Sequence, residues 1–259
     1  MAPDGVLIVN GENRHAIQAS ASAKCRVETF GFEGRVNWKA EIIDEQRGCF
    51  KFRVVRDGRA LTEVQMGIPG RHNIANAMAA MAICFHGGVE PETIAKALGT
   101  FRGAERRLTW RGCIDGVNVV DDYAHHPTEL QVTIKAAREY YKPRKMFVVF
   151  QPHQHSRTRF LLNDFARSFG AADLVLVPDI YFVRDSATER ELIDAKALVD
   201  AIRSNGGDAR YESSFDEITA TLCREVEPGD LVVTMGAGNV WRIAEDVLGC
   251  LTYKRQGLA

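Results

Sequence analysis

Residues 117–127 are Val117-Asn118-Val119-Val120-Asp121-Asp122-Tyr123-Ala124-His125-His126-Pro127, an apolar run that ends in charged and aromatic side chains. A short apolar run of this kind predicts a buried strand, and Pro127 suits the first turn of a helix that follows it. Similar apolar runs occur at 146–150, 174–177 and 231–235. Because helical segments separate these runs, the sequence predicts an α/β domain built on a doubly wound, mostly parallel sheet.

The helical segments are recognised by apolar side chains that recur every three or four residues, which places them on one helix face. The three faces are Leu130, Ile134, Ala137 and Tyr141; Phe215, Ile218, Leu222 and Val226; and Val240, Ile243, Ala244, Val247 and Leu248. Each face is suited to cover one side of the predicted sheet.

The first hundred residues have a different pattern. Segments 6–9, 25–30, 36–43 and 49–55 show the alternation and glycine-containing breaks of strands that face water on one side, which favours antiparallel pairing. The sequence therefore predicts a second, separate sheet in this part of the chain.

Two helices are predicted after these strands. Apolar residues at helical spacing run from Ile74 to Phe85 and are ended by Gly87-Gly88, and a shorter helix is predicted over Pro91–Leu98. Segment 99–112 is rich in glycine and arginine. It predicts a joint between a domain of residues 1–103 and a domain of residues 104–259.

The composition limits the classes of function. The chain has 259 residues with 33 basic and 34 acidic side chains, and its formal net charge of -1 offers no general attraction to nucleic acid or an anionic membrane. Six cysteines lie far apart without a Cys-x-x-Cys pair, which indicates reduced thiols rather than a zinc site. No run approaches the about 18 apolar residues of a membrane span. A cytoplasmic protein without nucleic-acid or membrane partners is predicted.

Polar side chains follow three of the predicted strands, at the carboxyl ends where parallel sheets bind ligands. The first strand leads into 121–127, the second into 151–159 and the third into Gly236-Ala237-Gly238-Asn239. Carboxylates, imidazoles, guanidinium groups and a glycine-rich turn at one sheet edge suit phosphate or carboxylate groups. Three simpler interpretations stay open: an aspartate caps the next helix, Arg157 and Arg159 are solvated residues at a helix start, and the Gly-x-Gly only permits a tight turn.

The helix that begins near Gly70 carries side chains suited to a purine. Asn73 and Asn76 are three residues apart and share a helix face, where two amides can bind the edge of an adenine. Alternatively, Asn73 is only the N-terminal cap of the helix.

Five motifs occur in order along the chain. They are Gly-Arg-His-Asn-x-x-Asn-x-x-Ala-Ala (70–80), Gly-x-x-Arg-Arg (103–107), Asp-Asp-Tyr-Ala-His-His-Pro-Thr-Glu (121–129), Phe-Gln-Pro-His-x-x-Ser-Arg-Thr (150–158) and Gly-Ala-Gly-Asn (236–239). Together they resemble the Mur ligases, in particular the branch that adds L-alanine to UDP-N-acetylmuramate. The resemblance implies that residues 1–103 are the last part of a central ATPase domain, with antiparallel strands and a helix pair. It implies a Rossmann-like C-terminal domain over residues 104–259.

The resemblance also implies a reaction, one step of peptidoglycan precursor synthesis. ATP phosphorylates the muramic acid carboxylate, and the amine of L-alanine attacks the resulting acyl phosphate. Mg²⁺ and basic groups hold the phosphates. The expected cofactors are ATP and Mg²⁺, and the expected substrates are UDP-N-acetylmuramate and L-alanine.

Roles for single residues follow from the same motifs. The resemblance implies ATP binding by His72, Asn73, Asn76, Arg106, Arg107 and Asp122, with adenine near the first three, phosphates near the arginines and ribose at Asp122. It implies substrate binding by Tyr123, His125, His126, His153, Arg157, Gly236 and Gly238. His125 and Arg157 are the expected catalytic residues, and no metal ligand is expected within the chain.

Two departures from the family pattern bear on activity. No Gly-Lys dipeptide occurs in the sequence, so the family's phosphate loop is missing, and Gly11-Glu12-Asn13 stands where the family has an acidic pair. The principal phosphate and metal ligands are therefore expected upstream or on a separate chain, and this chain is expected to be inactive alone. Segment 6–9 would then expose a sheet edge. Gln154 stands where some relatives have arginine, which leaves one substrate contact open.

Two other classes of function fit parts of the pattern. A metal-dependent phosphoesterase would use a cluster of aspartate and histidine ligands, namely Asp121, Asp122, His125, His126, His153 and His155. A non-catalytic nucleotide-binding module would keep ADP or ATP binding without any chemistry.

Overall fold

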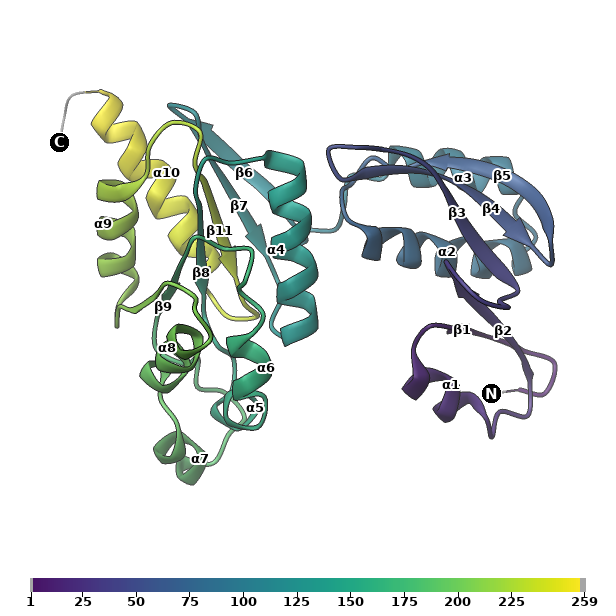
Figure 1. Cartoon of the computed structure of the whole chain (residues 1–259), viewed down its shortest axis with the longest axis horizontal. Coiled ribbons are helices and arrows are strands. Elements are labelled where there is room, and N and C mark those ends of the chain that lie inside the picture. The colour runs from purple at the N-terminus through teal and green to yellow at the C-terminus, as the bar shows by residue number, and fades with distance from the viewer. Residues whose placement is uncertain (1, 257–259) are drawn as a thin grey trace. The chain divides into compact units, whose positions relative to one another are not determined.

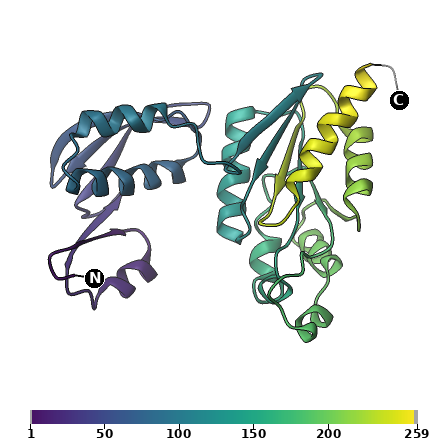
Figure 2. The same ribbon diagram turned by 180° about the vertical axis from the view of Figure 1, so that it is seen from behind.

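The computed structural model describes residues 2–256, and the chain divides into two compact units, Met1–Arg102 and Gly103–Ala259. Each unit has its own sheet (Figures 1 and 2). Within the described residues, none of the helices combines the length and the apolar character that a bilayer crossing requires.

The first unit is a five-stranded sheet with the strand order β1-β2-β3-β4-β5. Its elements are β1 (Val6–Asn10), α1 (Arg14–Ser20), β2 (Arg26–Gly31), β3 (Trp38–Gln46), β4 (Cys49–Arg56), β5 (Arg59–Gln65), α2 (Arg71–His86) and α3 (Pro91–Thr100). The helices predicted over 74–85 and 91–98 are confirmed as α2 and α3.

The predicted antiparallel pairing holds for only part of this sheet. β3, β4 and β5 are antiparallel, whereas β1 pairs in parallel with β2, and the end of β2 pairs in parallel with the start of β3. The prediction is wrong for β1 and β2 because α1 forms a crossover that returns the chain in its original direction. It is also wrong for β2 and β3, which pair in parallel over only two residues each, Phe30–Gly31 with Trp38–Lys39. Alternation of side chains along a strand does not report this direction.

The core of the first unit lies between its sheet and α2. Ile74, Met78 and Met81 of α2 are almost fully buried, and they belong to one apolar cluster with Trp38 of β3 and Phe52 of β4. Figure 2 shows α2 and α3 in front of these strands. Burial of this helix face stabilises the unit.

β1 is an edge strand, because its only partner in the described sheet is β2. Three of its apolar side chains are only partly buried, and Val9 alone is fully buried. The predicted exposed sheet edge near residues 6–9 is therefore confirmed.

The second unit is a six-stranded sheet with the order β10-β9-β8-β11-β7-β6. Its elements are β6 (Thr109–Ile114), β7 (Val117–Asp122), α4 (Pro127–Tyr141), β8 (Met146–Phe150), α5 (His155–Phe160), α6 (Leu162–Ala166), β9 (Leu174–Val177), α7 (Ala187–Leu192), α8 (Ala195–Ser204), β10 (Ala209–Tyr211), α9 (Phe215–Glu225), β11 (Leu231–Met235) and α10 (Trp241–Arg255). The four predicted apolar runs are β7, β8, β9 and β11, and they pair in parallel as predicted.

The two edge strands of this sheet were not predicted. β6 pairs antiparallel with β7, and β10 has only three residues beside β9. Neither has a continuous apolar run, because an edge strand is less covered than a central one.

Helices cover both faces of the sheet, as a doubly wound fold requires. One face packs Val148 and Val233 against α4, α6 and α8, and the other packs Val149 and Val232 against α9 and α10. Figure 1 shows α4 on one side of the central strands and α9 and α10 on the other. Consecutive strand residues point to opposite faces, so burial on both faces explains the uninterrupted apolar runs.

One expectation about the cysteines is wrong. Cys223 of α9 and Cys250 of α10 form a disulfide, whereas the sequence predicted reduced thiols. The other four cysteines are not in a disulfide. The two bonded residues are 27 positions apart in sequence, and the packing of α9 beside α10 brings their Cα atoms to 6.5 Å. A spacing of this length carries no signal of pairing in the sequence.

Candidate functional site

Three loops meet at the carboxyl ends of the parallel strands of the second unit. β11 lies between β8 and β7, so the glycine-rich turn that follows β11 lies between the loop after β7 and the loop after β8. The three polar strand ends predicted from the sequence therefore come together at one sheet edge.

Arg106 joins two of these loops. Its Nε donates to Oδ2 of Asp121 at 2.8 Å, and its two terminal nitrogens donate to the carbonyl oxygens of Gly236 (2.7 Å) and Gly238 (3.1 Å). Asp121 is fully buried, and its other carboxylate oxygen accepts a hydrogen bond from Thr234 Oγ1. Every guanidinium nitrogen of Arg106 thus has a protein partner, which fixes the strand ends relative to one another.

Asp122 is the second carboxylate at the end of β7, and it is 3% exposed. Its Oδ1 accepts the N–H of Ala124 and its Oδ2 accepts the N–H of Leu108, both at 2.7 Å. Burial raises the pKa of Asp122 to about 6, although the two main-chain hydrogen bonds and the charge of Arg107 act in the opposite direction. The carboxylate therefore organises the loop around it.

Arg107 has a different environment from its neighbour. Its side chain is exposed, and within the described residues its guanidinium makes no hydrogen bond or salt bridge. The group lies 5.8 Å from the ring centre of Tyr123. A guanidinium held near an aromatic ring without a carboxylate partner is available to an anion.

Four rings follow one another along this edge of the sheet, and we call Tyr123, His125, His153 and Tyr181 the aromatic row. Tyr123 and His125 have ring centres 5.2 Å apart, and His125 and His153 are 6.2 Å apart. His153 stacks on Tyr181 with centres 5.6 Å apart and planes inclined by 13°. The row brings together side chains from the loops after β7, β8 and β9.

Several buried polar atoms in the segments that follow β8 and β11 have no hydrogen-bond partner among the described residues. They are Gln151 Oε1, His153 Nδ1, Arg157 Nη1 and Asn239 Oδ1. Unpaired buried polar atoms are uncommon in folded proteins because each costs about 1–3 kcal/mol, and they are often sites where a ligand supplies the partner. The set contains both donors and acceptors, which suits a polar ligand with groups of both kinds.

The cations near His153 also favour an anionic ligand. The pKa of His153 is lowered, first by burial and then by the positive charges of Arg157 and Arg184 and by His125. A lowered pKa keeps this imidazole neutral near pH 7. The charged groups beside it are the two guanidinium groups and the carboxylate of Asp185, which acts to raise the pKa of His153.

Two glycines of the turn after β11 are required by close contacts. Gly236 has a φ of +147°, and a Cβ at Gly238 would lie 2.5 Å from Gln151 Oε1 and 3.1 Å from the Tyr181 ring. The turn therefore needs glycine both for its backbone and for its approach to these side chains. This supports the tight-turn interpretation without excluding ligand binding.

Residues after β9 belong to this site although they were not predicted. Tyr181 pairs with His153 as an isolated parallel bridge. Asp185 accepts hydrogen bonds from the N–H of His155 and from Ser156 Oγ, and although burial acts to raise its pKa, these bonds lower it. The strand-end rule applied to 174–177 could have indicated this segment, but Tyr181 lies four residues beyond the strand.

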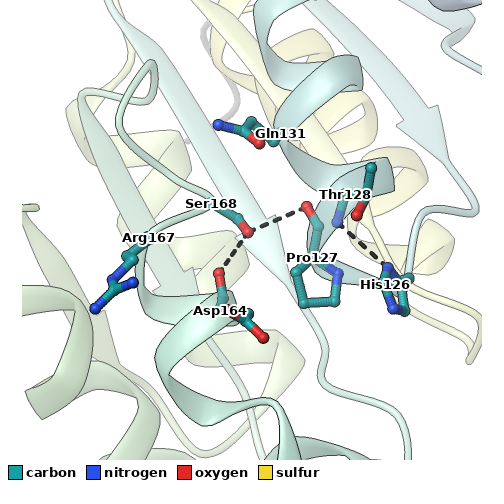
Figure 3. A pocket seen from close by; sticks show the side chains of 7 residues that line it. All are labelled: His126, Pro127, Thr128, Gln131, Asp164, Arg167 and Ser168. Atoms are coloured by element: carbon teal, nitrogen blue, oxygen red, sulfur yellow. Dashed lines mark hydrogen bonds between the residues drawn. The ribbon is translucent and has the colours of Figure 1, made fainter. Parts of the chain in front are cut away.

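His126 is not part of the aromatic row. Its Nδ1 accepts the N–H of Thr128 at the start of α4, so it caps that helix. A pocket of about 300 Å³ lies beside it, lined by His126, Pro127, Thr128, Gln131, Asp164, Arg167 and Ser168. Figure 3 shows Ser168 bonded to the carbonyl oxygens of Pro127 and Asp164 across this pocket. Apart from Pro127, the lining side chains are polar, and they come from the N-cap and first turns of α4, from α6 and from the loop after α6.

The predicted adenine residues lie at the start of α2 in the first unit. Asn73 Nδ2 donates to the carbonyl oxygen of Pro69, and Asn76 Nδ2 donates to Asn73 Oδ1 at 3.3 Å. The helix cap is Gly70, without a side-chain hydrogen bond. The simpler interpretation of Asn73 as the cap is therefore wrong, and the two amides share a face as predicted.

The ligand set of a metal-dependent phosphoesterase does not come together. Asp121 pairs with Arg106, Asp122 binds main-chain N–H groups, and His126 caps a helix. Among the described residues, no three histidine, cysteine, aspartate or glutamate side chains are arranged to hold a metal ion. A two-metal site needs such convergence, so this geometry disfavours the phosphoesterase alternative.

Comparison with known proteins gives matches over both units. Residues 106–238 match the Mur ligase glutamate ligase domain, and residues 1–84 match the Mur ligase middle domain. The UDP-N-acetylmuramate--L-alanine ligase of Agathobacter rectalis is 40% identical over 245 residues, which is 94% of this chain and 53% of that protein. The enzyme of the same name from Caldanaerobacter subterraneus subsp. tengcongensis is 37% identical over 246 residues, which is 95% of this chain and 53% of that protein.

A solved structure has the same fold. It is the UDP-N-acetylmuramate-alanine ligase MurC of Thermotoga maritima, with a TM-score of 0.75 and 24% sequence identity. The match covers 97% of this chain and 52% of that one. The chain spans about half the length of the curated relatives it matches.

Proposed function

This chain belongs to the Mur ligase family, and we propose that it takes part in the ATP-dependent ligation of L-alanine to UDP-N-acetylmuramate in the cytoplasm. The observation that carries this proposal is its similarity to proteins named for that activity, 37% and 40% identical over nearly its whole length. The site supports the proposal because it combines unpaired polar atoms with two guanidinium groups, as a carboxylate-bearing substrate requires.

The acceptor amino acid is assigned to the aromatic row. Arg157 has a buried, unpaired Nη1 that suits the carboxylate of L-alanine. The stacked rings of His153 and Tyr181 would contact the rest of the amino acid. Tyr123 and His125 extend the row towards the loop after β7. Held in this way, the amine is close to the acyl carbon, and positioning of this kind supplies much of the rate of a ligation.

ATP fits the residues of the chain unevenly. Arg107 has an exposed guanidinium that suits a phosphate oxygen, and the face shared by Asn73 and Asn76 suits adenine. Asp122 fits ribose less well, because both of its oxygens already accept main-chain N–H groups. ATP would supply the phosphoryl group that activates the muramic acid carboxylate, and Mg²⁺ would neutralise the phosphate oxygens.

The remaining phosphate ligands are assigned to a part of the protein outside these 259 residues. The chain contains no Gly-Lys dipeptide, so the backbone cradle of a phosphate loop is not encoded in it. We therefore expect no turnover from this chain alone. The roles of His126 and Gly236 as substrate contacts stay predictions, because His126 caps α4 and the carbonyl of Gly236 accepts from Arg106.

A chimera tests this proposal. It joins the first half of the Agathobacter rectalis relative to this chain, and phosphate release is measured with ATP, UDP-N-acetylmuramate and L-alanine, each omitted in turn. Release that needs all three supports the proposal, and this chain alone serves as the background control. If phosphate release requires a cell-wall peptide as the acceptor instead of L-alanine, the assigned acceptor is contradicted. ADP binding by this chain, with an inactive chimera, favours the nucleotide-binding alternative.

A further inference from the structure

On one side of its ring, His125 has one hydrogen-bond acceptor and one nearby carboxylate. Its Nδ1 lies 3.0 Å from the carbonyl oxygen of Tyr123 and 3.5 Å from Oε2 of Glu129. Glu129 is in the first turn of α4, and the same carboxylate oxygen accepts the main-chain N–H of His125 at 3.1 Å. A carbonyl oxygen can only accept a hydrogen bond, so Nδ1 is the nitrogen that carries the proton.

The other ring nitrogen is then the basic one, because a neutral imidazole has a single N–H. Within residues 2–256, Nε2 of His125 makes no hydrogen bond. The ring belongs to the aromatic row, between Tyr123 and His153. His125 therefore offers an unprotonated nitrogen at the proposed acceptor site while its opposite side is anchored.

The two neighbouring histidines are less suited to accept a proton. His126 already accepts the N–H of Thr128 through its Nδ1. The pKa of His153 is lowered by burial and by the cations beside it, which weakens it as a base. The groups that face His125 are Tyr123 in its own loop, Glu129 of α4 and His153 after β8. Of these, Glu129 is the carboxylate.

We infer that His125 Nε2 accepts the proton of the attacking amine, and that Glu129 is the positioning residue that, together with the carbonyl oxygen of Tyr123, keeps the proton on Nδ1. This inference rests on the proposed ligation. The amine nitrogen forms a bond to the acyl carbon, the bond from that carbon to the phosphate oxygen breaks, and phosphate leaves with the electron pair. The amine proton passes to Nε2, and the carboxylate of Glu129 stabilises the imidazolium that results.

The tautomer is measured first, on the 259-residue chain itself. Long-range proton–nitrogen NMR of the imidazole, at a pH where it is neutral, is expected to show a protonated Nδ1 and an unprotonated Nε2 for His125. Glu129→Gln should raise the population with a proton on Nε2. The control is Glu139→Gln on the same helix, whose partner is Lys135, and it should leave the signals unchanged. If neutral His125 in the wild-type chain carries its proton on Nε2, the inference is overturned, and this result does not depend on the activity of the chimera.

Kinetics in the chimera described above give the second measurement. Glu129→Gln should lower kcat by about tenfold or more, with the KM for L-alanine changed by less than about twofold, because a positioning role affects the step and not the binding. Glu129→Asp, which keeps the charge, should recover part of the loss. If the wild-type chimera is active and Glu129→Gln leaves kcat unchanged, the inference fails and the proposed function stands. If the wild-type chimera has no L-alanine-dependent turnover, the proposed function fails.

Discussion

Adjacent residues of the same type have different environments at the strand ends of the second unit. Arg106 has all its nitrogens bonded to the protein, whereas the guanidinium of Arg107 is exposed. His125 belongs to the aromatic row, whereas His126 caps α4. Side chains one position apart leave the backbone in different directions. In each pair, one side chain therefore bonds to the protein and the other is available at the site.

The two arginines give the first prediction. Arg106→Gln should lower the free energy of unfolding of the second unit by about 3–5 kcal/mol, because it leaves the buried carboxylate of Asp121 without its cation. Arg107→Gln should leave stability unchanged and weaken binding of ATP or ADP. Urea denaturation and calorimetry measure the two effects. Equal destabilisation by both variants would contradict the division of roles.

Asp122 gives a prediction about pH. Burial raises its pKa from 3.8 to about 6. Between about pH 4 and pH 6, the folded state therefore keeps a proton on this carboxyl that the unfolded state has lost. The contribution of this carboxyl to stability is therefore fully present below pH 4 and is lost as pH rises to 6, by about 3 kcal/mol at most. Asp122→Asn should be more destabilising, relative to wild type, at pH 4.5 than at pH 7.5. Urea denaturation of both proteins at each pH tests this, and an equal difference at both pH values would contradict it.

At the level of elements, the second unit gains constraints that join neighbouring segments. The salt bridge of Arg159 with Glu189 connects α5 to α7 through two hydrogen bonds, both of about 3 Å. Asp185, which lies just before α7, accepts hydrogen bonds from two residues at the start of α5. These contacts hold the segment that carries Tyr181 against the loop after β8, which explains how the aromatic row is completed.

The disulfide between α9 and α10 gives a prediction at the same level. Without reductant, four of the six cysteines should react with a thiol reagent in denaturant, and all six should react after reduction. Replacing both Cys223 and Cys250 by serine should lower the free energy of unfolding by about 2–4 kcal/mol relative to the oxidised protein, because the unfolded chain regains freedom. Six reactive thiols without reductant would contradict the bond.

At the level of the whole molecule, each unit has a core of its own. The first unit has one apolar cluster, and the second has one on each face of its sheet. None of these clusters, over the residues that the structure describes, contains side chains from both units. We therefore propose that the two units are separate domains, since each buries apolar surface without the other.

Limited proteolysis tests this division. Phe101 and Arg102 are exposed, so trypsin should cut after Arg102 and give a stable fragment that begins at Gly103. That fragment, produced by itself, should unfold in a single cooperative transition in urea. The first unit, produced by itself, is expected to be less soluble than the Gly103–Ala259 fragment, because β1 has an unpaired sheet edge. A Gly103–Ala259 fragment without a cooperative transition would contradict the proposal.

The sequence by itself determined the second unit's central strands and the helices α2, α3, α4, α9 and α10. Their signals are local, because a strand buried on both faces must be apolar throughout and a helix must repeat its apolar face every turn. It also determined that the polar strand ends meet, since parallel strands bring their carboxyl ends to one edge.

Only the tertiary structure decided the pairing of β1 with β2, the Cys223–Cys250 bond, and the presence of Tyr181 in the site. It also gave Arg106 and Arg107 different environments, and it anchored Nδ1 of His125 through the carbonyl oxygen of Tyr123 and the carboxylate of Glu129. These features depend on which segments lie side by side after folding. That information is not contained in the spacing of residues along one strand or one helix.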